Sequence, residues 1–198
     1  MDTRQQILDV GRELLVEDGL RAITTNAIAQ LSRVSKKTLY QHFPTKDALI
    51  EEILVSFMEE NLRPWDAILE SDEPAIERIL ASLRFVGEFL PLVQSRIINQ
   101  VEAVAPHLWE AIDAIRMQRL QKLMSLVTDA QEEGCFRCDV NPDHWILLLT
   151  GVVRSVLNPT VLLRIGVPLT EIVASVQTIY FDGLLTEKGR LYVASKDL

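Results

Sequence analysis

The chain has 198 residues, a net charge of −8 at neutral pH and a hydrophobic content of 48%. Its length allows one or two domains, and its acidic balance restricts any nucleic-acid surface to a local basic segment. No apolar run approaches the ~20 residues that span a bilayer, and the N-terminus lacks the apolar segment of a secretion signal. We therefore expect a soluble, cytoplasmic protein that does not enter a membrane.

The first expected element is a helix over residues 3–18, in which apolar residues recur at helical spacing and which Gly19 ends. Two short helices follow between Thr24 and Phe43. Thr24 and Ser35 are favourable N-caps for them, and each cap is flanked by apolar residues at the spacing of a hydrophobic staple. We expect four side chains to face inward: Ile28, Ala29, Leu39 and Phe43.

These two short helices carry a basic segment. No acidic residue occurs between Asp18 and Asp47, whereas the same interval holds five Lys or Arg residues. Such a segment on an acidic chain is typical of a DNA-reading module, because phosphates attract it while the remaining surface repels them. The outward face of the second helix has donors for phosphates and base edges in Lys36, Lys37, Tyr40 and Gln41. A helical hairpin with a solvated basic face is the alternative interpretation.

The same stretch resembles the DNA-binding domain of the TetR/AcrR family of bacterial transcriptional regulators. The matching elements keep the family's spacing without a gap: Thr24-Thr25, Ile28-Ala29, Val34-Ser35, Thr38-Leu39-Tyr40, His42-Phe43 and Lys46. The resemblance is specific over about the first 50 residues and only architectural beyond them. It implies an all-α chain in which a three-helix domain with a helix-turn-helix precedes a helical ligand-binding and dimerisation domain.

The resemblance and the outward face together indicate the residues that contact DNA. We expect contacts in the groove from Asn26, Lys36, Lys37, Thr38 and Gln41. We expect phosphate contacts from residues that match family positions: Thr25, Tyr40, His42 and Lys46.

Arg33 departs from the family pattern, which usually has Gly in the turn between the two helices. That position tends to need a left-handed backbone, which costs a non-Gly residue roughly 1 kcal/mol. Either the turn is built differently or the strain is tolerated. Arg33 could also add a phosphate contact.

The rest of the chain is expected to be helical. Lys46 begins a helix that should run to about Arg63, where Pro64 breaks or kinks it, and this helix links a DNA-binding domain over 1–46 to a body over 47–198. Further helices are expected over residues 75–90, with a break at Pro91, and over 92–104, 106–133, 142–157 and 169–185, with Gly189 ending the last one.

The helices near 142–157 and 169–185 are apolar on more than one face, so each must be buried most of the way round. One face of each is expected to meet a second subunit, and the resemblance implies the same homodimer. Burial in the core of a single chain is the alternative. The expected interface residues are Leu148, Val152, Val156, Val173, Val176 and Tyr180.

Aromatic and polar residues of the middle helices suggest an apolar pocket with a few polar groups for a small-molecule effector. The expected lining residues are Trp65, Phe85, Phe89, Asn99, His107 and Trp109. Each of these residues alone is also compatible with an ordinary place in the core or on the surface.

Cys135 and Cys138 form the only C-x-x-C pair. With one nearby His they make an incomplete zinc set, so no metal or other cofactor is expected. This pair has three interpretations: loop residues without special chemistry, a thiol switch, and half a metal site. The loop interpretation is preferred.

The sequence therefore predicts a homodimeric repressor that binds palindromic double-stranded operator DNA and that a small molecule releases. The alternative is a dimeric DNA-binding regulator without such an inducer, controlled by a protein partner or by thiol oxidation. An enzyme is not expected, because the three His residues are scattered and there is no nucleophile elbow or phosphate-binding Gly loop.

Overall fold

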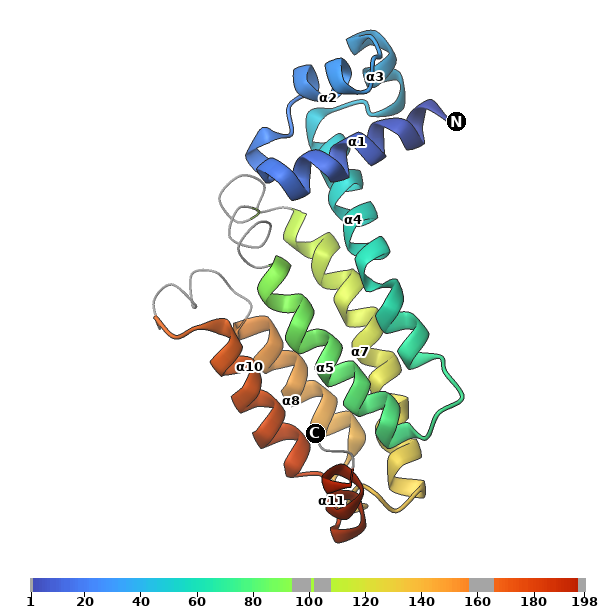
Figure 1. The fold of residues 1–198 in the computed structure, drawn as a ribbon, viewed down its shortest axis with the longest axis vertical. Helices are drawn as coiled ribbons and strands as arrows, with labels where there is room; N and C mark the ends of the chain where they lie inside the picture. Colours follow the sequence, from blue (N-terminus) through green and yellow to red (C-terminus); the bar gives the residue numbers. More distant parts are fainter. Residues whose placement is uncertain (1, 94–100, 102–107, 157–165, 196–198) are drawn as a thin grey trace. The chain divides into compact units, whose positions relative to one another are not determined.

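The computed structural model describes residues 2–93, 101, 108–156 and 166–195, and every regular element within these ranges is helical (Figure 1). The predicted all-α class is confirmed. The α-helices are α1 (Thr3–Asp18), α2 (Thr25–Leu31), α3 (Lys36–His42), α4 (Lys46–Leu69), α5 (Ala75–Val93), α7 (Trp109–Glu132), α8 (Pro142–Val156), α10 (Leu169–Gln177) and α11 (Glu187–Ala194). A 3-10 turn, η1, spans Leu20–Ala22, and a π-helical turn, η4, spans Thr178–Asp182.

The chain divides into two compact units. Unit 1 comprises Met1–Arg63 and Leu92–Arg116, and unit 2 comprises Pro64–Pro91 and Met117–Leu198. Helices α1 to α3 belong to unit 1 and α8, α10 and α11 belong to unit 2. Helices α4, α5 and α7 contribute residues to both.

Unit 1 is held together by the packing of α1 on the first half of α4. A side chain at Gly11 would collide with Ile53, so the two helix backbones approach closely at this point. Arg12 strengthens the contact: its guanidinium donates to Ser56 Oγ at 2.7 Å and pairs with the Glu60 carboxylate at 2.8 Å. The core around this contact contains Ile7, Leu15, Leu20, Ile28, Leu39, Phe43, Leu49 and Ile53, all at most 1% exposed.

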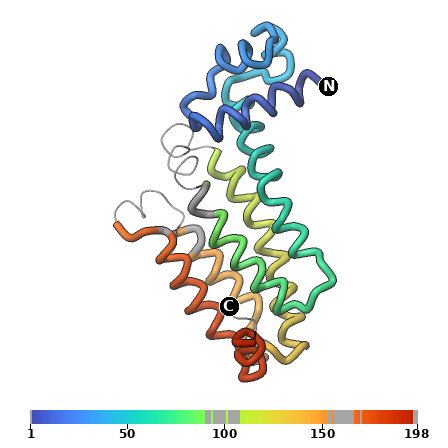
Figure 2. Tube along the Cα trace, in the orientation of Figure 1, coloured from blue at the N-terminus to red at the C-terminus, as the bar shows by residue number. Residues whose placement is uncertain are grey.

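Unit 2 is a layer of helices joined by polar contacts as well as by its apolar core (Figure 2). Gln177, at the end of α10, donates from Nε2 to the Leu83 carbonyl of α5 at 2.8 Å. Trp145 of α8 donates from Nε1 to the Tyr180 carbonyl at 3.0 Å, and Tyr192 of α11 donates its hydroxyl to Glu77 at 2.6 Å. These bonds set the register of α5, α8, α10 and α11.

The prolines do not end helices where the sequence predicts. α4 continues through Pro64 to Leu69, and α5 continues past Pro91 to Val93. A proline inside a helix removes one hydrogen bond at a cost of ∼3 kcal/mol, and in α4 the burial of Trp65 and Leu69 beyond it offsets that cost. The breaks expected at Pro64 and Pro91 were therefore wrong.

The C-terminal part also differs from the expectation. The last long helix does not reach residue 185, because α10 gives way to the π-helical turn η4 after Gln177. Gly189 lies inside α11 rather than ending a helix, and Thr186 caps that helix by accepting from the Gly189 N–H. A Cβ at Gly189 would collide with the Cys135 carbonyl, which explains a glycine there. Most of the helix expected over 92–104 falls outside the described residues.

In the part of the chain that the structure describes, no helix has both the length and the apolar character to cross a membrane.

We expect Glu133 to be a stability determinant of unit 2. Its carboxylate accepts from the first two amides of α5, Ala75 N at 2.7 Å and Ile76 N at 3.4 Å, and so caps a helix distant in sequence. Glu133→Ala should lower the free energy of unfolding by roughly 1–2 kcal/mol, as the loss of an N-cap does. Urea denaturation would measure the change, and Glu132→Ala on the exposed side is the control. Equal stability of both variants would contradict the capping role.

Candidate nucleic-acid interface

The helix-turn-helix of unit 1 is formed by α2 and α3, and side-chain caps fix the start of each helix. Thr24 Oγ1 accepts from Ala27 N at 3.1 Å, and Ser35 Oγ accepts from Thr38 N at 3.0 Å. Thr45 caps α4 in the same way through Ala48 N, at 3.0 Å. The predicted inward residues Ile28, Ala29, Leu39 and Phe43 are all buried, which confirms the predicted faces of both helices.

The turn between α2 and α3 contains a residue in the left-handed backbone conformation, as the family resemblance implies. That residue is Arg33, with φ 53°. Val34 N donates to the Ala29 carbonyl at 3.0 Å, and Arg33 N donates to the Gln30 carbonyl at 3.1 Å. These two bonds form a Schellman motif, which normally has glycine at the left-handed position. The turn is therefore of the usual kind, and its strain is tolerated.

The predicted contact residues lie on the exposed side of these helices. Asn26, Arg33, Lys36, Lys37, Tyr40, Gln41 and Lys46 are exposed, and Thr25, Thr38 and His42 are half-buried. The Thr38 hydroxyl already exchanges a hydrogen bond of 2.9 Å with Ser35 Oγ, so it contributes to the cap of α3. The remaining side chains of α3 offer two ammonium groups, a phenol and an amide on one surface.

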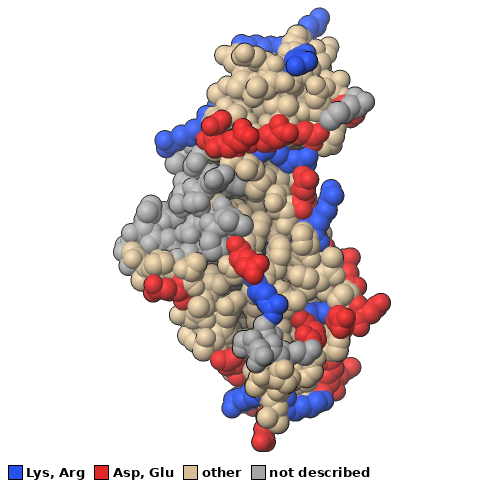
Figure 3. Space-filling model, in the orientation of Figure 1, with Lys and Arg blue, Asp and Glu red and all other residues tan. Residues whose placement is uncertain are grey.

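Charge separates within the part of unit 1 formed by α1, α2 and α3. In Figure 3 the margin formed by α2 and α3 shows Lys and Arg atoms, whereas Asp and Glu atoms gather along the side formed by α1. This distribution follows from the sequence, since no acidic residue occurs between Asp18 and Asp47. A polyanion would therefore be attracted to one side of this domain only.

Two residues of α1 position the helix-turn-helix, and the sequence reasoning missed both. Gln6 donates from Nε2 to the Ser32 carbonyl at the end of α2, at 3.1 Å. Arg4 pairs with Glu52 of α4, and its guanidinium carbon lies 5.5 Å from the centre of the Phe43 ring. Neither contact has a local signature, because each joins residues that are far apart in the chain.

The predicted effector residues are brought together only in part. Within unit 2 the rings of Trp65 and Phe85 stack at 6.1 Å between centroids, and those of Phe85 and Phe89 stack at 5.5 Å. Trp109 is half-buried at the start of α7 and belongs to unit 1. Asn99 and His107 lie outside the described residues.

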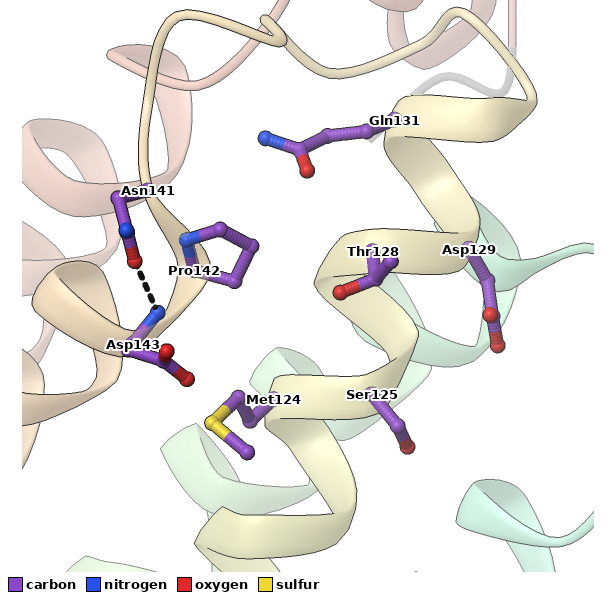
Figure 4. A pocket seen from close by; sticks show the side chains of 8 residues that line it. All are labelled: Met124, Ser125, Thr128, Asp129, Gln131, Asn141, Pro142 and Asp143. Carbon is purple, nitrogen blue, oxygen red and sulfur yellow. Dashed lines mark hydrogen bonds between the residues drawn. The ribbon is translucent and has the colours of Figure 1, made fainter.

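A cavity of about 540 Å³ in unit 2 contains none of the predicted effector residues. It lies between the end of α7 and the start of α8 and is lined by Met124, Ser125, Thr128, Asp129, Gln131, Asn141, Pro142 and Asp143 (Figure 4). Two of its amides are already used, because Asn141 Oδ1 accepts from Asp143 N at 2.8 Å and Gln131 donates to the Arg137 and Val140 carbonyls. These two side chains therefore serve the fold of this corner.

The predicted interface helices of unit 2 have exposed apolar side chains. Leu147 and Leu148 of α8 are 69% and 60% exposed, and Ile179 of η4 is 70% exposed. Val152, Val173, Val176 and Tyr180 are half-buried, and nothing is described of the Val156 side chain. The opposite face of α8 is buried through Trp145 and Leu149.

Cys135 and Cys138 are both free thiols, the first buried and the second exposed. Burial raises the pKa of the Cys135 thiol, Lys188 opposes this shift, and Glu133 adds to it. Because the thiolate is the reactive form, Cys135 is poorly suited to react at neutral pH. Among the described residues, no group of three or more His, Cys, Asp or Glu side chains is placed to hold a metal ion.

We expect Arg33→Gly to stabilise unit 1 by roughly 1 kcal/mol, because glycine adopts the left-handed backbone without steric cost. Arg33→Ala is the matched control: it removes the same charge but keeps the strain, and its stability should stay near that of the wild type. Thermal and urea unfolding would measure the difference between the two variants. A destabilising Gly substitution would show that the Arg33 side chain, rather than its backbone, holds the turn.

Comparisons with known proteins agree with this geometry. A family model described as bacterial regulatory proteins of the tetR family matches residues 7–53, which cover α2, α3 and the start of α4. The chain is 38% identical over 165 residues to the transcriptional regulator UidR of Escherichia coli, covering 78% of this chain and 80% of that protein. It is 25% identical to the transcriptional repressor KstR2 of Rhodococcus jostii, over 70% of both chains.

A solved structure extends the likeness to the whole fold. A regulator from Saccharomonospora viridis, crystallised in complex with choline, superimposes with a TM-score of 0.65 at 16% identity, covering 93% of this chain and 98% of that one. At that identity the likeness concerns the fold alone. With the family model over its helix-turn-helix and a relative that is similar along most of both chains, the protein belongs to the TetR family of bacterial transcriptional regulators.

Proposed function

We propose that the protein is a homodimeric transcriptional repressor that binds palindromic operator DNA through α3 and is released by a small molecule bound in its helical body. The observation that supports the DNA-binding role most strongly is the exposed face of α3. Lys36, Lys37 and Gln41 are exposed on it, within a stretch of sequence that has no acidic residue. Ammonium and amide donors on a helix suit guanine and adenine edges in the major groove.

The proposed dimer uses α8 and α10. Leu147 and Leu148 are large apolar side chains that are more than half exposed, and they share a helix with Val152. Contiguous exposed apolar side chains of this kind mark association surfaces in monomers. A two-fold dimer matches a palindromic operator, because two reading helices about 34–36 Å apart meet successive major grooves.

The proposed release by a small molecule draws on the relatives and on the aromatic stack. One fold neighbour was crystallised with choline, so this fold can hold a small molecule. In the present chain the stacked rings of Trp65, Phe85 and Phe89 are an apolar surface suited to a ligand. To release DNA, the ligand must bind the DNA-free conformation better than the DNA-bound one.

Control by thiol oxidation is less well supported than control by a ligand. The buried Cys135 thiol has a raised pKa, so little thiolate is present at neutral pH. Control by a protein partner has no specific support in the described residues.

Selection of bound DNA from a random pool tests the DNA-binding role. Wild-type protein should select a palindrome, and Lys36→Ala or Lys37→Ala should relax preference at one position per half-site, at a cost of roughly 1–3 kcal/mol. Lys46→Ala is the control for a phosphate contact: it should weaken binding to all sequences alike and lower the salt slope by about one. If both α3 variants select the wild-type motif, α3 does not read the bases.

Analytical ultracentrifugation tests the proposed dimer surface. Leu148→Glu places a charge on the α8 surface, and burying it unpaired in an interface should raise the dimer dissociation constant at least about tenfold. Leu191→Glu is the matched control, because Leu191 is 68% exposed on α11, a helix that contains none of the proposed interface residues. A Leu148→Glu variant that remains as dimeric as the control would exclude this surface.

A further inference from the structure

Among the described residues of unit 2, four buried polar atoms lack a hydrogen-bond partner: Trp65 Nε1, Ser82 Oγ and the Nε atoms of Arg78 and Arg119. The two guanidiniums bond through Nη2 instead, so only Trp65 and Ser82 have a polar side-chain group that is wholly unused. Trp65 is 5% exposed and Ser82 is 2% exposed. Neither Trp65 Nε1 nor Ser82 Oγ has a hydrogen-bond partner among the residues that the structure describes. Buried polar groups in folded proteins nearly always have a partner, so each exception calls for an explanation.

Phe85 connects the two donors, since it stacks on Trp65 and lies on the same helix as Ser82. Phe85 stacks on Trp65 with 6.1 Å between centroids and an interplanar angle of 27°, and Phe89 continues the stack at 14°. Ser82 precedes Phe85 by one turn of α5, so the two residues share a face of that helix. Phe85 and Phe89 are only partly buried, and the stack therefore reaches from covered donors to accessible rings.

A second tryptophan in the same unit shows how a structural indole is accommodated. Trp145 is 7% exposed, close to the burial of Trp65, yet its Nε1 donates to the Tyr180 carbonyl at 3.0 Å. The fold thus satisfies one buried indole and leaves the other without a partner. Keeping an unused donor in a buried position lowers stability, a pattern typical of a binding site rather than of a core.

We propose that Trp65 Nε1 and Ser82 Oγ are the polar recognition point of the effector site, and that the effector is a planar, apolar molecule with a carbonyl or carboxylate acceptor. The inference rests on the proposed function in one respect: it places the effector in unit 2. The stacked rings bind the planar part, and the two donors bind its acceptor. Both donors are covered in this structure, so the effector reaches them only when neighbouring side chains shift. The effector therefore makes different contacts with the covered and the opened conformation.

The donor chemistry selects against cationic effectors. An indole N–H donates and never accepts, so an ammonium group cannot satisfy it. A quaternary ammonium could bind the ring faces through cation–π contacts, but it would leave the Trp65 donor unused. The Ser82 hydroxyl could accept from an ammonium, but Trp65 Nε1 could not, so an effector that bonds to both groups must carry an acceptor.

The test uses the full-length protein and a matched set of probes. The probes are 2-naphthoate and 2-acetylnaphthalene, which carry acceptors, and 2-naphthylmethylammonium, which has the same rings and a cation. Isothermal titration calorimetry measures their binding to wild type, Trp65→Phe, Ser82→Ala and Trp145→Phe. Thermal unfolding without probe measures the stability of the same four proteins. Phenylalanine keeps an aromatic ring at position 65 and removes only the donor and part of the surface.

We expect at least one acceptor probe to bind the wild type more tightly than the cationic probe. Trp65→Phe should weaken that binding by roughly 5- to 150-fold, the range for a lost hydrogen bond that leaves a buried group unpaired, and Ser82→Ala should weaken it in the same direction. Ser82→Ala should leave the Tm of the free protein unchanged, since its hydroxyl has no partner to lose. Trp65→Phe loses part of a buried ring but no hydrogen bond, so it should lower the Tm less than Trp145→Phe does. Trp145→Phe should leave probe affinity unchanged and lower the Tm of the free protein by about 2–4 °C.

Three results would overturn the inference. The first is that neither acceptor probe binds, the second is that the cationic probe binds best, and the third is that Trp65→Phe destabilises the free protein as much as Trp145→Phe does. The proposed function is judged separately by DNA selection. If the palindrome is selected and Trp65→Phe leaves binding of the acceptor probe unchanged, the donor pair is excluded while the DNA-binding role stands. If the acceptor probes bind as expected and no DNA is selected, the donor pair stands and the DNA-binding role is excluded.

Discussion

The close approach of α1 and α4 at Gly11 and Ile53 is the constraint on which unit 1 depends. A larger residue at Gly11 would separate the two helices, and Arg12 could then no longer reach both Ser56 and Glu60. Through Gln6, α1 also binds the carbonyl of Ser32, the C-cap residue of α2. The helix-turn-helix and the first half of α4 are thereby joined, so a change in the direction of this part of α4 would carry α3 with it.

The turn between α2 and α3 illustrates how a functional surface tolerates local strain. A left-handed Arg33 costs about 1 kcal/mol relative to glycine, yet both hydrogen bonds of the Schellman motif are present. The exposed guanidinium adds positive charge beside Lys36 and Lys37, on a protein whose net charge is −8.

Unit 2 combines a framework of long-range polar contacts with two buried side chains, Trp65 and Ser82, whose donors have no partner. Glu133 caps α5, Trp145 joins α8 to η4, and Arg119 pairs with Asp66 between α7 and α4 at 2.7 Å. The unused donors of Trp65 and Ser82 differ from the unpaired Nε atoms of Arg78 and Arg119, because those two guanidiniums bond through Nη2. An effector that completes these bonds would stabilise the conformation to which it binds, and by linkage that conformation would be favoured whenever the effector is present.

The sequence by itself determined the features that depend on near neighbours. The caps Thr24, Ser35 and Thr45, the inward positions Ile28, Leu39 and Phe43, and the exposed basic face of α3 all lie within one stretch of about 23 residues. Capping and helical periodicity act over three or four residues, so such features are legible without a structure.

Only the tertiary structure decided the features that depend on distant residues. The continuation of α4 through Pro64 required burial of Trp65 and Leu69, and the glycine inside α11 is required by the carbonyl of Cys135. The stacking of Trp65 on Phe85 and the capping of α5 by Glu133 likewise join separate helices. Burial and long-range hydrogen bonds outweigh local propensity by a few kcal/mol at such positions, and a linear pattern contains no record of which distant residue supplies them.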